Sequence, residues 1–249
     1  MVVKAGCCGW AVRGGRRAYF RAFKLIEVQS TFYKLPRVQT AQRWREEAPA
    51  GFEFTIKAWQ TITHPPSSPT WRKAGLTVSK SKASRYGCLR PTEENFEAWD
   101  KTKEICDALE AKICVLQCPA SFNWSRENKK NIEEFMNAID RGGVEIGWEP
   151  RGDWRQHQEG VAEICDELRL IHVVDVFRWR PASKHRLSYI RLHGIGRGEV
   201  NYSYRYSDED LRRLLGWTAE LEAGKHAVYV LFNNVSMAED CLRFSRILH

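Results

Sequence analysis

Several familiar signatures are missing from this chain of 249 residues. It has no run of 18 or more apolar residues, so no segment qualifies as a membrane-spanning helix. Its eight cysteines never stand in a Cys-x-x-Cys spacing, which argues against a zinc ribbon and against a thioredoxin-like redox motif. The Gly-x-Gly-x-x-Gly and Walker A patterns are absent as well, so we expect no nucleotide cofactor.

Segments that target or divide a chain are equally scarce. In residues 1–17, MVVKAGCCGWAVRGGRR, the positive charge follows a short apolar patch and no small-residue cleavage site is present, unlike in a signal peptide. We find no internal repeat, low-complexity tract or linker. We therefore expect a cytoplasmic protein that forms a single domain over residues 1–249.

The cysteines lie in patterns that favour burial. Cys106 and Cys165 fall within helical patterns, and Cys114 falls within a strand pattern. Buried thiols behave as small apolar side chains, and that is the role we expect here. Disulfides, as in intracellular proteins of thermophiles, are the alternative.

Positive charge is in excess. Lysine and arginine number 39 against 31 aspartate and glutamate residues, which gives a formal net charge of +8. A basic surface attracts anions such as nucleic acid or phosphorylated metabolites. Exposed loops carry lysine and arginine in most proteins, so the charge alone does not choose between a specific anionic partner and none.

Apolar runs separated by helical patterns predict eight strands. They are residues 2–8, 25–30, 52–57, 113–117, 144–149, 171–176, 189–194 and 227–233. Strand–helix alternation is typical of parallel βαβ units, and eight such units in about 250 residues suit a (β/α)8 TIM barrel. A doubly wound open sheet is the rival fold, but the phosphate-binding motifs that would support it are missing.

The predicted strands carry polar residues opposite their apolar faces. In 52-FEFTIK-57, Phe54 and Ile56 share one face and Lys57 lies on the other. The same alternation across the strands places six ionisable side chains opposite the apolar face, at or near the C-terminal strand ends: Glu27, Lys57, Glu149, Asp175, Arg191 and His193. TIM barrels have their active sites at those ends, so we predict that the six converge in one cavity. A satisfied polar network without chemistry is the alternative.

Eight short segments carry a resemblance that spans nearly the whole chain. They are 27-EVQSTFYKLP-36, 52-FEFTIKAWQTITH-64, 86-YGCLRPT-92, 117-QCPASF-122, 145-EIGWEPRGDW-154, 171-IHVVDVF-177, 190-IRLHG-194 and 232-FNN-234. In this order they resemble the YecE-like family, also called domain of unknown function 72. The resemblance implies a TIM barrel similar to those of endonuclease IV and xylose isomerase. It implies no activity, because the family is named for lacking one.

The connections that follow the strands are basic and aromatic. Examples are 177-FRWRPASKHR-186 and 195-IGRGEVNYSYRY-206, and the longest connection covers residues 58–91. Long connections are usually lids or binding elements, so we predict that residues 58–91 form a mobile lid over the mouth. Arginine and lysine contact phosphates, while tryptophan and tyrosine offer stacking faces for bases.

A metal site is one interpretation of the six side chains. Glu149, Asp175 and His193, with Glu27 nearby, are ligand types that suit Mg, Mn or Zn. Lys57 and Arg191 would compete with a metal ion for these carboxylates, so we favour no metal.

A metal-free interpretation assigns Lys57 and Arg191 to an anionic group or a developing oxyanion. Glu149 or Glu27 then acts as general base or acid, and His193 as a proton shuttle. A Schiff base at Lys57 is a further option that nothing in the sequence singles out. We assign substrate contacts to Gln29, Tyr33, His64, Gln117, Arg151 and Asn233.

Three classes of function stay open. The favoured one is an enzyme that acts on a phosphate-bearing substrate, either nucleic acid or a nucleotide. The others are a divalent-metal-dependent isomerase or hydrolase of the sugar type, and a nucleic-acid-binding module without turnover. The expected partner is an anionic small molecule or nucleic acid, and not a membrane.

Overall fold

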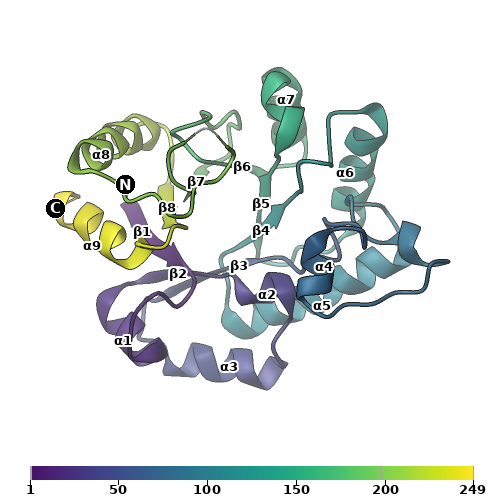
Figure 1. Ribbon diagram of the computed structural model, residues 1–249, viewed down its shortest axis with the longest axis horizontal. Coiled ribbons are helices and arrows are strands. Elements are labelled where there is room, and N and C mark those ends of the chain that lie inside the picture. Colours follow the sequence, from purple (N-terminus) through teal and green to yellow (C-terminus); the bar gives the residue numbers. More distant parts are fainter. Residues whose placement is uncertain (1, 197, 249) are drawn as a thin grey trace.

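A computed structural model describes residues 2–196 and 198–248. Its eight strands close into one parallel barrel, in which each strand pairs with the next and β8 pairs with β1 (Figure 1). The strands are β1 (Val2–Cys8), β2 (Leu25–Val28), β3 (Glu53–Lys57), β4 (Ile113–Gln117), β5 (Glu145–Glu149), β6 (Ile171–Val174), β7 (Leu187–Leu192) and β8 (Ala227–Phe232). The predicted TIM barrel is confirmed.

Helices surround the barrel (Figure 1). The longer ones are α1 (Gly15–Ala22), α3 (Val38–Glu47), α5 (Glu93–Leu109), α6 (Arg126–Ala138), α7 (Gln158–Glu167), α8 (Asp208–Glu222) and α9 (Met237–Ile247). Shorter pieces are α2 (Ser30–Tyr33), α4 (Pro69–Lys73) and the 3-10 turns η1 (Ala83–Arg85) and η2 (Gly152–Gln156). The connection from β6 to β7, residues 175–186, contains no helix. There the ring of Trp179 covers the strand instead, with its centroid 4.3 Å from that of His172.

The alternation of side chains across each strand separates two apolar layers. Phe54, Ile56 and Ile190 belong to the large core between the barrel and its helices. Ile113, Val173 and nine further side chains fill the barrel itself. Lys57 and Arg191 have the inward phase, as predicted from the sequence.

Several strands end earlier than predicted. Gln29 and Ser30 do not extend β2, because Gln29 already has helical dihedral angles and precedes α2. Strand β7 starts at Leu187, two residues before the predicted start. Ser125 and Ser207 cap α6 and α8, since each hydroxyl accepts a backbone N–H from the first turn of its helix.

The connection of residues 58–91 is more firmly anchored than the predicted lid. Its two ends pair with each other, because the amide of Gly87 donates to the carbonyl of Thr61 and the amide of Leu89 donates to that of Ile62, at 2.8 and 3.0 Å. Trp71 of α4 is buried and donates its indole N–H to the carbonyl of His64. The base of the connection is therefore held together by its own hydrogen bonds, while mobility of its exposed tip stays a prediction.

The cysteines follow the expected pattern. All eight are free thiols, and seven of them are buried; Cys88 is half-buried. Among the described residues, no helix combines the length and apolar character that crossing a bilayer requires.

Candidate active site at the mouth of the barrel

A buried charge cluster forms the floor of the mouth. Arg191 on β7 lies between two carboxylates, with one amino group 2.8 Å from Glu27 Oε1 and the other hydrogen-bonded to Glu149 Oε2. The second oxygen of Glu27 accepts the Tyr189 hydroxyl at 3.0 Å. The Arg191 and Glu27 side chains are removed from water, because Arg191 is 1% exposed and Glu27 is fully buried.

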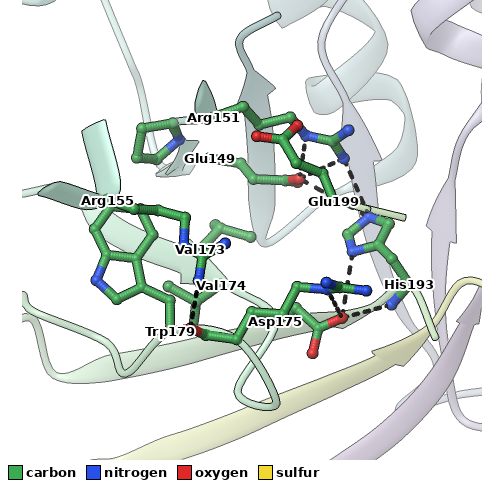
Figure 2. Close-up of a pocket in the computed structure, with 11 residues that line it drawn as sticks. Glu149, Arg151, Arg155, Val173, Val174, Asp175, Trp179, His193 and Glu199 are labelled. Carbon is green, nitrogen blue, oxygen red and sulfur yellow. Dashed lines mark hydrogen bonds and ion pairs between the residues drawn. The ribbon is translucent and has the colours of Figure 1, made fainter. Parts of the chain in front are cut away.

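A chain of polar contacts continues from Glu149 along the mouth to Arg151, His193 and Asp175 (Figure 2). Arg151, just after β5, donates to Glu149 Oε1 from Nε and Nη2 at 3.1 and 2.8 Å. Its Nη2 also lies 3.3 Å from His193 Nε2, and because a guanidinium only donates, this imidazole nitrogen must accept. The imidazole proton is therefore on Nδ1, which lies 3.8 Å from Asp175 Oδ2.

Burial and charge move the pKa values of this chain in different directions. Burial alone would raise the pKa of Glu149, but Arg191 and Arg151 outweigh it and hold that pKa well below its usual range. Burial raises the pKa of Asp175 to about 6, although two backbone N–H donors, from His193 and Phe177, oppose the rise. Burial lowers the pKa of His193 well below its usual value, so the imidazole is neutral.

Lys57, at the end of β3, is the least compensated charge of the mouth. Its ammonium lies 3.6 Å from the centre of the Phe32 ring and has no carboxylate within 4.0 Å among the described residues. Burial, followed by the positive charge of Arg191, lowers its pKa to about 7. Lys57 thus titrates in the physiological range.

A cavity of about 50 Å³ opens beside the polar chain. Glu149, Asp175 and His193 line it, together with Arg151, Arg155, Arg178, Trp179 and Glu199 (Figure 2). Lys57, Glu27 and Arg191 do not line it. The prediction of one cavity for all six side chains is therefore corrected: three face the cavity, two lie beneath it and Lys57 stands apart. The volume suits a few waters or a small anionic group.

The predicted substrate-binding side chains divide into two groups. Gln29 donates its amide to Asn233 at 3.0 Å, across the gap between the ends of β2 and β8. Gln117 is buried and donates to the carbonyl of Cys118. Arg151 is central to the mouth, as described above. Of these four, Gln29, Asn233 and Arg151 make side-chain contacts that join different strand ends around the mouth.

His64 and Tyr33, for which we predicted substrate contacts, do not line the cavity. His64 is buried, with Nδ1 2.8 Å from the Thr63 hydroxyl and its ring edge-on to Phe32. Burial, then the charge of Lys57, lowers its pKa to about 3. Tyr33 lines a separate hollow with Pro36 and Leu76, outside the mouth.

The donor set does not fit a resident divalent metal. Glu149, Asp175 and His193 were the candidate ligands, yet both oxygens of Glu149 are bound by guanidinium groups and the accepting nitrogen of His193 faces Arg151. Within residues 2–196 and 198–248, no three His, Cys, Asp or Glu side chains are arranged to hold a metal ion.

Sequence reasoning did not single out several side chains of this site. Arg178 is largely buried and donates to the carbonyls of Gly194 and Gly196 at 2.6 and 3.3 Å. Glu199 accepts the Gly152 amide at 2.8 Å and so ties together the loops after β5 and β7. Only the basic, glycine-rich composition of these loops hinted at such roles.

Gly194 positions His193, and its replacement gives a testable prediction. Its φ is +80°, and an added Cβ would lie 2.0 Å from the carbonyl oxygen of Asn201. We expect Gly194→Ala to lower the free energy of unfolding by about 2–3 kcal/mol, through left-handed strain and backbone overlap. Gly15→Ala is the matched control, because Gly15 has a φ of +74° but no atom within 4 Å of an added Cβ, and should lose only about 1 kcal/mol. Equal losses in urea melts would show that the close approach to Asn201 does not matter.

Comparison with known proteins places the chain in a family. A family model described as "Protein of unknown function DUF72" matches residues 6–249. The UPF0759 protein YunF of Bacillus subtilis (strain 168) is 23% identical over 236 residues, which cover 88% of this chain and 80% of the relative.

Solved structures of the same family have the same fold. A DUF72 family protein of Enterococcus faecalis V583 superposes with a TM-score of 0.76 at 16% identity, covering 99% of this chain and 95% of the other. One from Thermotoga maritima MSB8 superposes with a TM-score of 0.72 at 21% identity, covering 100% and 99%. More distant barrels include a D-tagatose 3-epimerase-like protein, with a TM-score of 0.57, and an AP endonuclease of family 2 from Brucella melitensis, with a TM-score of 0.55.

Proposed function

This chain belongs to the DUF72 family, and we propose that it is an enzyme that binds a small phosphate-bearing substrate at the C-terminal mouth of its barrel. The observation that carries the proposal is the uncompensated positive charge of Lys57 in a largely buried mouth. A buried cation without a counter-ion is costly, and an anionic ligand would remove that cost.

The charges of the mouth support an anionic ligand. Four arginines face it, namely Arg151, Arg155, Arg178 and Arg191, and four carboxylates balance them, namely Glu27, Glu149, Asp175 and Glu199. The neighbouring imidazoles of His64 and His193 are neutral at pH 7. Lys57 is then the charge in excess. A bound phosphate would meet it in a partly dehydrated site, where charge-assisted hydrogen bonds are strong.

Arg151 is the arginine best placed to hold the anion. Its Nε and Nη2 are engaged by Glu149 and His193, but its Nη1 makes no hydrogen bond within the described residues. Arg191 cannot serve in this way, because its two amino groups are bound to Glu27 and Glu149 beneath the cavity. The anion-binding role therefore passes from Arg191, as suggested by the sequence, to Arg151.

Acid–base chemistry at this mouth would involve Asp175 and Lys57 in place of Glu27 and Glu149. A general acid or base works best with a pKa near the operating pH. The pKa of Asp175 is about 6 and that of Lys57 about 7. Glu149 is instead held as the anion by two arginines, and both oxygens of Glu27 are occupied. His193 holds its proton toward Asp175 and would help to orient it.

The size of the cavity favours a small substrate over a nucleic-acid strand. About 50 Å³ admits a phosphate group but no stacked base beside it. Barrels of the same fold described as a D-tagatose 3-epimerase-like protein and an AP endonuclease support an enzyme only at the level of fold.

Calorimetric titration with inorganic phosphate and with ribose 5-phosphate tests the proposal. We expect Arg151→Gln to weaken phosphate binding about tenfold or more, because a hydrogen bond to a charged group contributes roughly 1.5–3 kcal/mol. Arg205→Gln is the control, since Arg205 is 60% exposed, pairs with Glu239 and lies in the connection after β7. Its effect should be small and should vanish in high salt. Equal, salt-sensitive losses in both variants would mean that anions merely collect over the basic surface.

A further inference from the structure

We propose that Lys57 is a nucleophile that forms an imine with an aldehyde or ketone group of the substrate. The inference rests on the proposed function, because it takes the mouth of the barrel as the site of reaction. The inference also specifies the reactive group of the substrate, which would carry a carbonyl carbon in addition to its anionic group.

The surroundings of Lys57 differ from those of a structural lysine. It is the only buried lysine among the described residues, at 7% exposure. Other lysines, such as Lys4, Lys103 and Lys129, pair with carboxylates at the surface or at the far end of the barrel. The nitrogen of Lys57 makes no hydrogen bond within the described residues, yet it is not fully enclosed. An amine that holds no structural partner and remains accessible is available for chemistry.

The packing around Lys57 favours the free amine. The Phe32 ring lies beneath the nitrogen at 3.6 Å and displaces water from that side. The charged and titratable groups that act on it are Arg191 on β7, Arg151 and Glu149 around the end of β5, Glu27 on β2 and His64 in the connection after β3. Burial and the two arginines outweigh the two carboxylates and bring the pKa of the amine to about 7. Roughly half of the protein molecules then carry the nucleophilic form at neutral pH.

The chemical step can be written in full. The nitrogen lone pair attacks the carbonyl carbon, a C–N bond forms, and the carbonyl π electrons move to oxygen, which takes up a proton. The nitrogen then releases a proton to give a neutral carbinolamine. Protonation of its hydroxyl lets the C–O bond break and water leave, which yields a protonated imine. The net reaction joins one carbonyl, one amine and one proton and releases one water, and hydrolysis reverses it.

The charge of the mouth suits the product as well as the reactants. A protonated imine carries the same single positive charge as the ammonium that it replaces. The free Nη1 of Arg151 borders the cavity and Lys57 does not line it, so the substrate would extend from an anionic group at Arg151 to a carbonyl carbon at Lys57. Arg151 would therefore hold the phosphate while Lys57 bonds to the carbonyl carbon, so one substrate satisfies both groups.

Reductive trapping tests the inference. The intact protein is incubated at pH 7 with glycolaldehyde phosphate and sodium cyanoborohydride, and adducts are located by peptide mass spectrometry. We expect labelling at Lys57 at least tenfold faster than at Lys130, a 70% exposed lysine on α6. The rate at Lys57 should rise with pH and level off just above pH 7. Lys57→Met and Lys57→Arg should both lose the fast adduct, while Lys130→Met should keep it.

Two outcomes separate this inference from the proposed function. Labelling that is no faster at Lys57 than at Lys130 overturns the imine, and calorimetric binding of inorganic phosphate then still supports the anion site. Fast labelling of Lys57 by uncharged glycolaldehyde, without any binding of phosphate, supports the nucleophile and overturns the phosphate-bearing substrate. Thermal melts of each variant exclude unfolding as the cause of a lost adduct.

Discussion

Replacing Arg191 by methionine is expected to lower the free energy of unfolding by about 3–5 kcal/mol, because it strands two buried carboxylates. Both Glu27 and Glu149 hydrogen-bond to this guanidinium in a region that water hardly reaches. Methionine keeps much of the side-chain volume, so the loss reports on charge rather than on a cavity. Equilibrium unfolding in urea, with the slope compared between variants, measures the effect.

Two further variants make that expectation specific. Arg205→Met removes an exposed pair with Glu239 and should lose only about 0–1 kcal/mol. Combining Arg191→Met with Glu27→Gln and Glu149→Gln should recover part of the stability, because neither position then holds a buried carboxylate that has lost its guanidinium partner. A triple variant as unstable as Arg191→Met alone would show that packing, and not charge pairing, makes Arg191 important.

The sequence was sufficient for the barrel because its strand signals are local. Each strand is a short apolar run between helical patterns, and parallel strands with helical crossovers leave few alternative folds. The phase of Lys57 and Arg191 followed from the same alternation. The connection after β6 departed from the pattern, since residues 175–186 use Trp179 against His172 in place of a helix.

The site was less predictable, because it depends on which charges face one another across the barrel. Glu27 and Glu149 are far apart in sequence, and only closure of the barrel brings both to Arg191. That pairing places three of the predicted catalytic groups in one buried ion-pair cluster at the floor of the mouth. The free Nη1 of Arg151 likewise depends on contacts with Glu149 and His193 that no local pattern encodes. Residue types could be read from the sequence, but their partners could not.

Lys57 contrasts with the paired charges of Arg191, Glu27 and Glu149, because burying its unpaired ammonium lowers the free energy of unfolding. A side chain retained at such a cost is more readily explained by chemistry than by folding. The same strand alternation that identified it cannot show that it has no counter-ion. That property is a result of every carboxylate nearby being engaged by arginine or by backbone N–H groups.

Replacing Lys57 by methionine is therefore expected to raise the free energy of unfolding by about 3–4 kcal/mol at pH 7. A lysine whose pKa falls from 10.5 to about 7 on folding loses roughly 4 kcal/mol at that pH. Methionine escapes this loss, while it gives up a cation–π contact with Phe32 of about 1 kcal/mol.

The pH dependence of that gain identifies its origin. Below pH 7 the lysine is protonated in both states, so the gain from methionine is constant and at its largest. Between pH 7 and 10.5 the unfolded state binds more protons than the folded state, so the stability of the wild type rises with pH and the gain shrinks toward zero. Lys130→Met, at a 70% exposed position, should show no such trend. Urea melts from pH 6 to pH 10 measure how the free energy of unfolding of each variant differs from that of the wild type. Groups that titrate elsewhere contribute equally to variant and wild type, so they cancel in this difference.

A gain that does not change with pH would mean that Lys57 has an ordinary pKa, and that methionine stabilises the protein only by packing against Phe32. Stabilisation that declines as the lysine loses its proton would instead establish an amine held near neutrality inside the mouth, which is the form that the proposed imine chemistry requires.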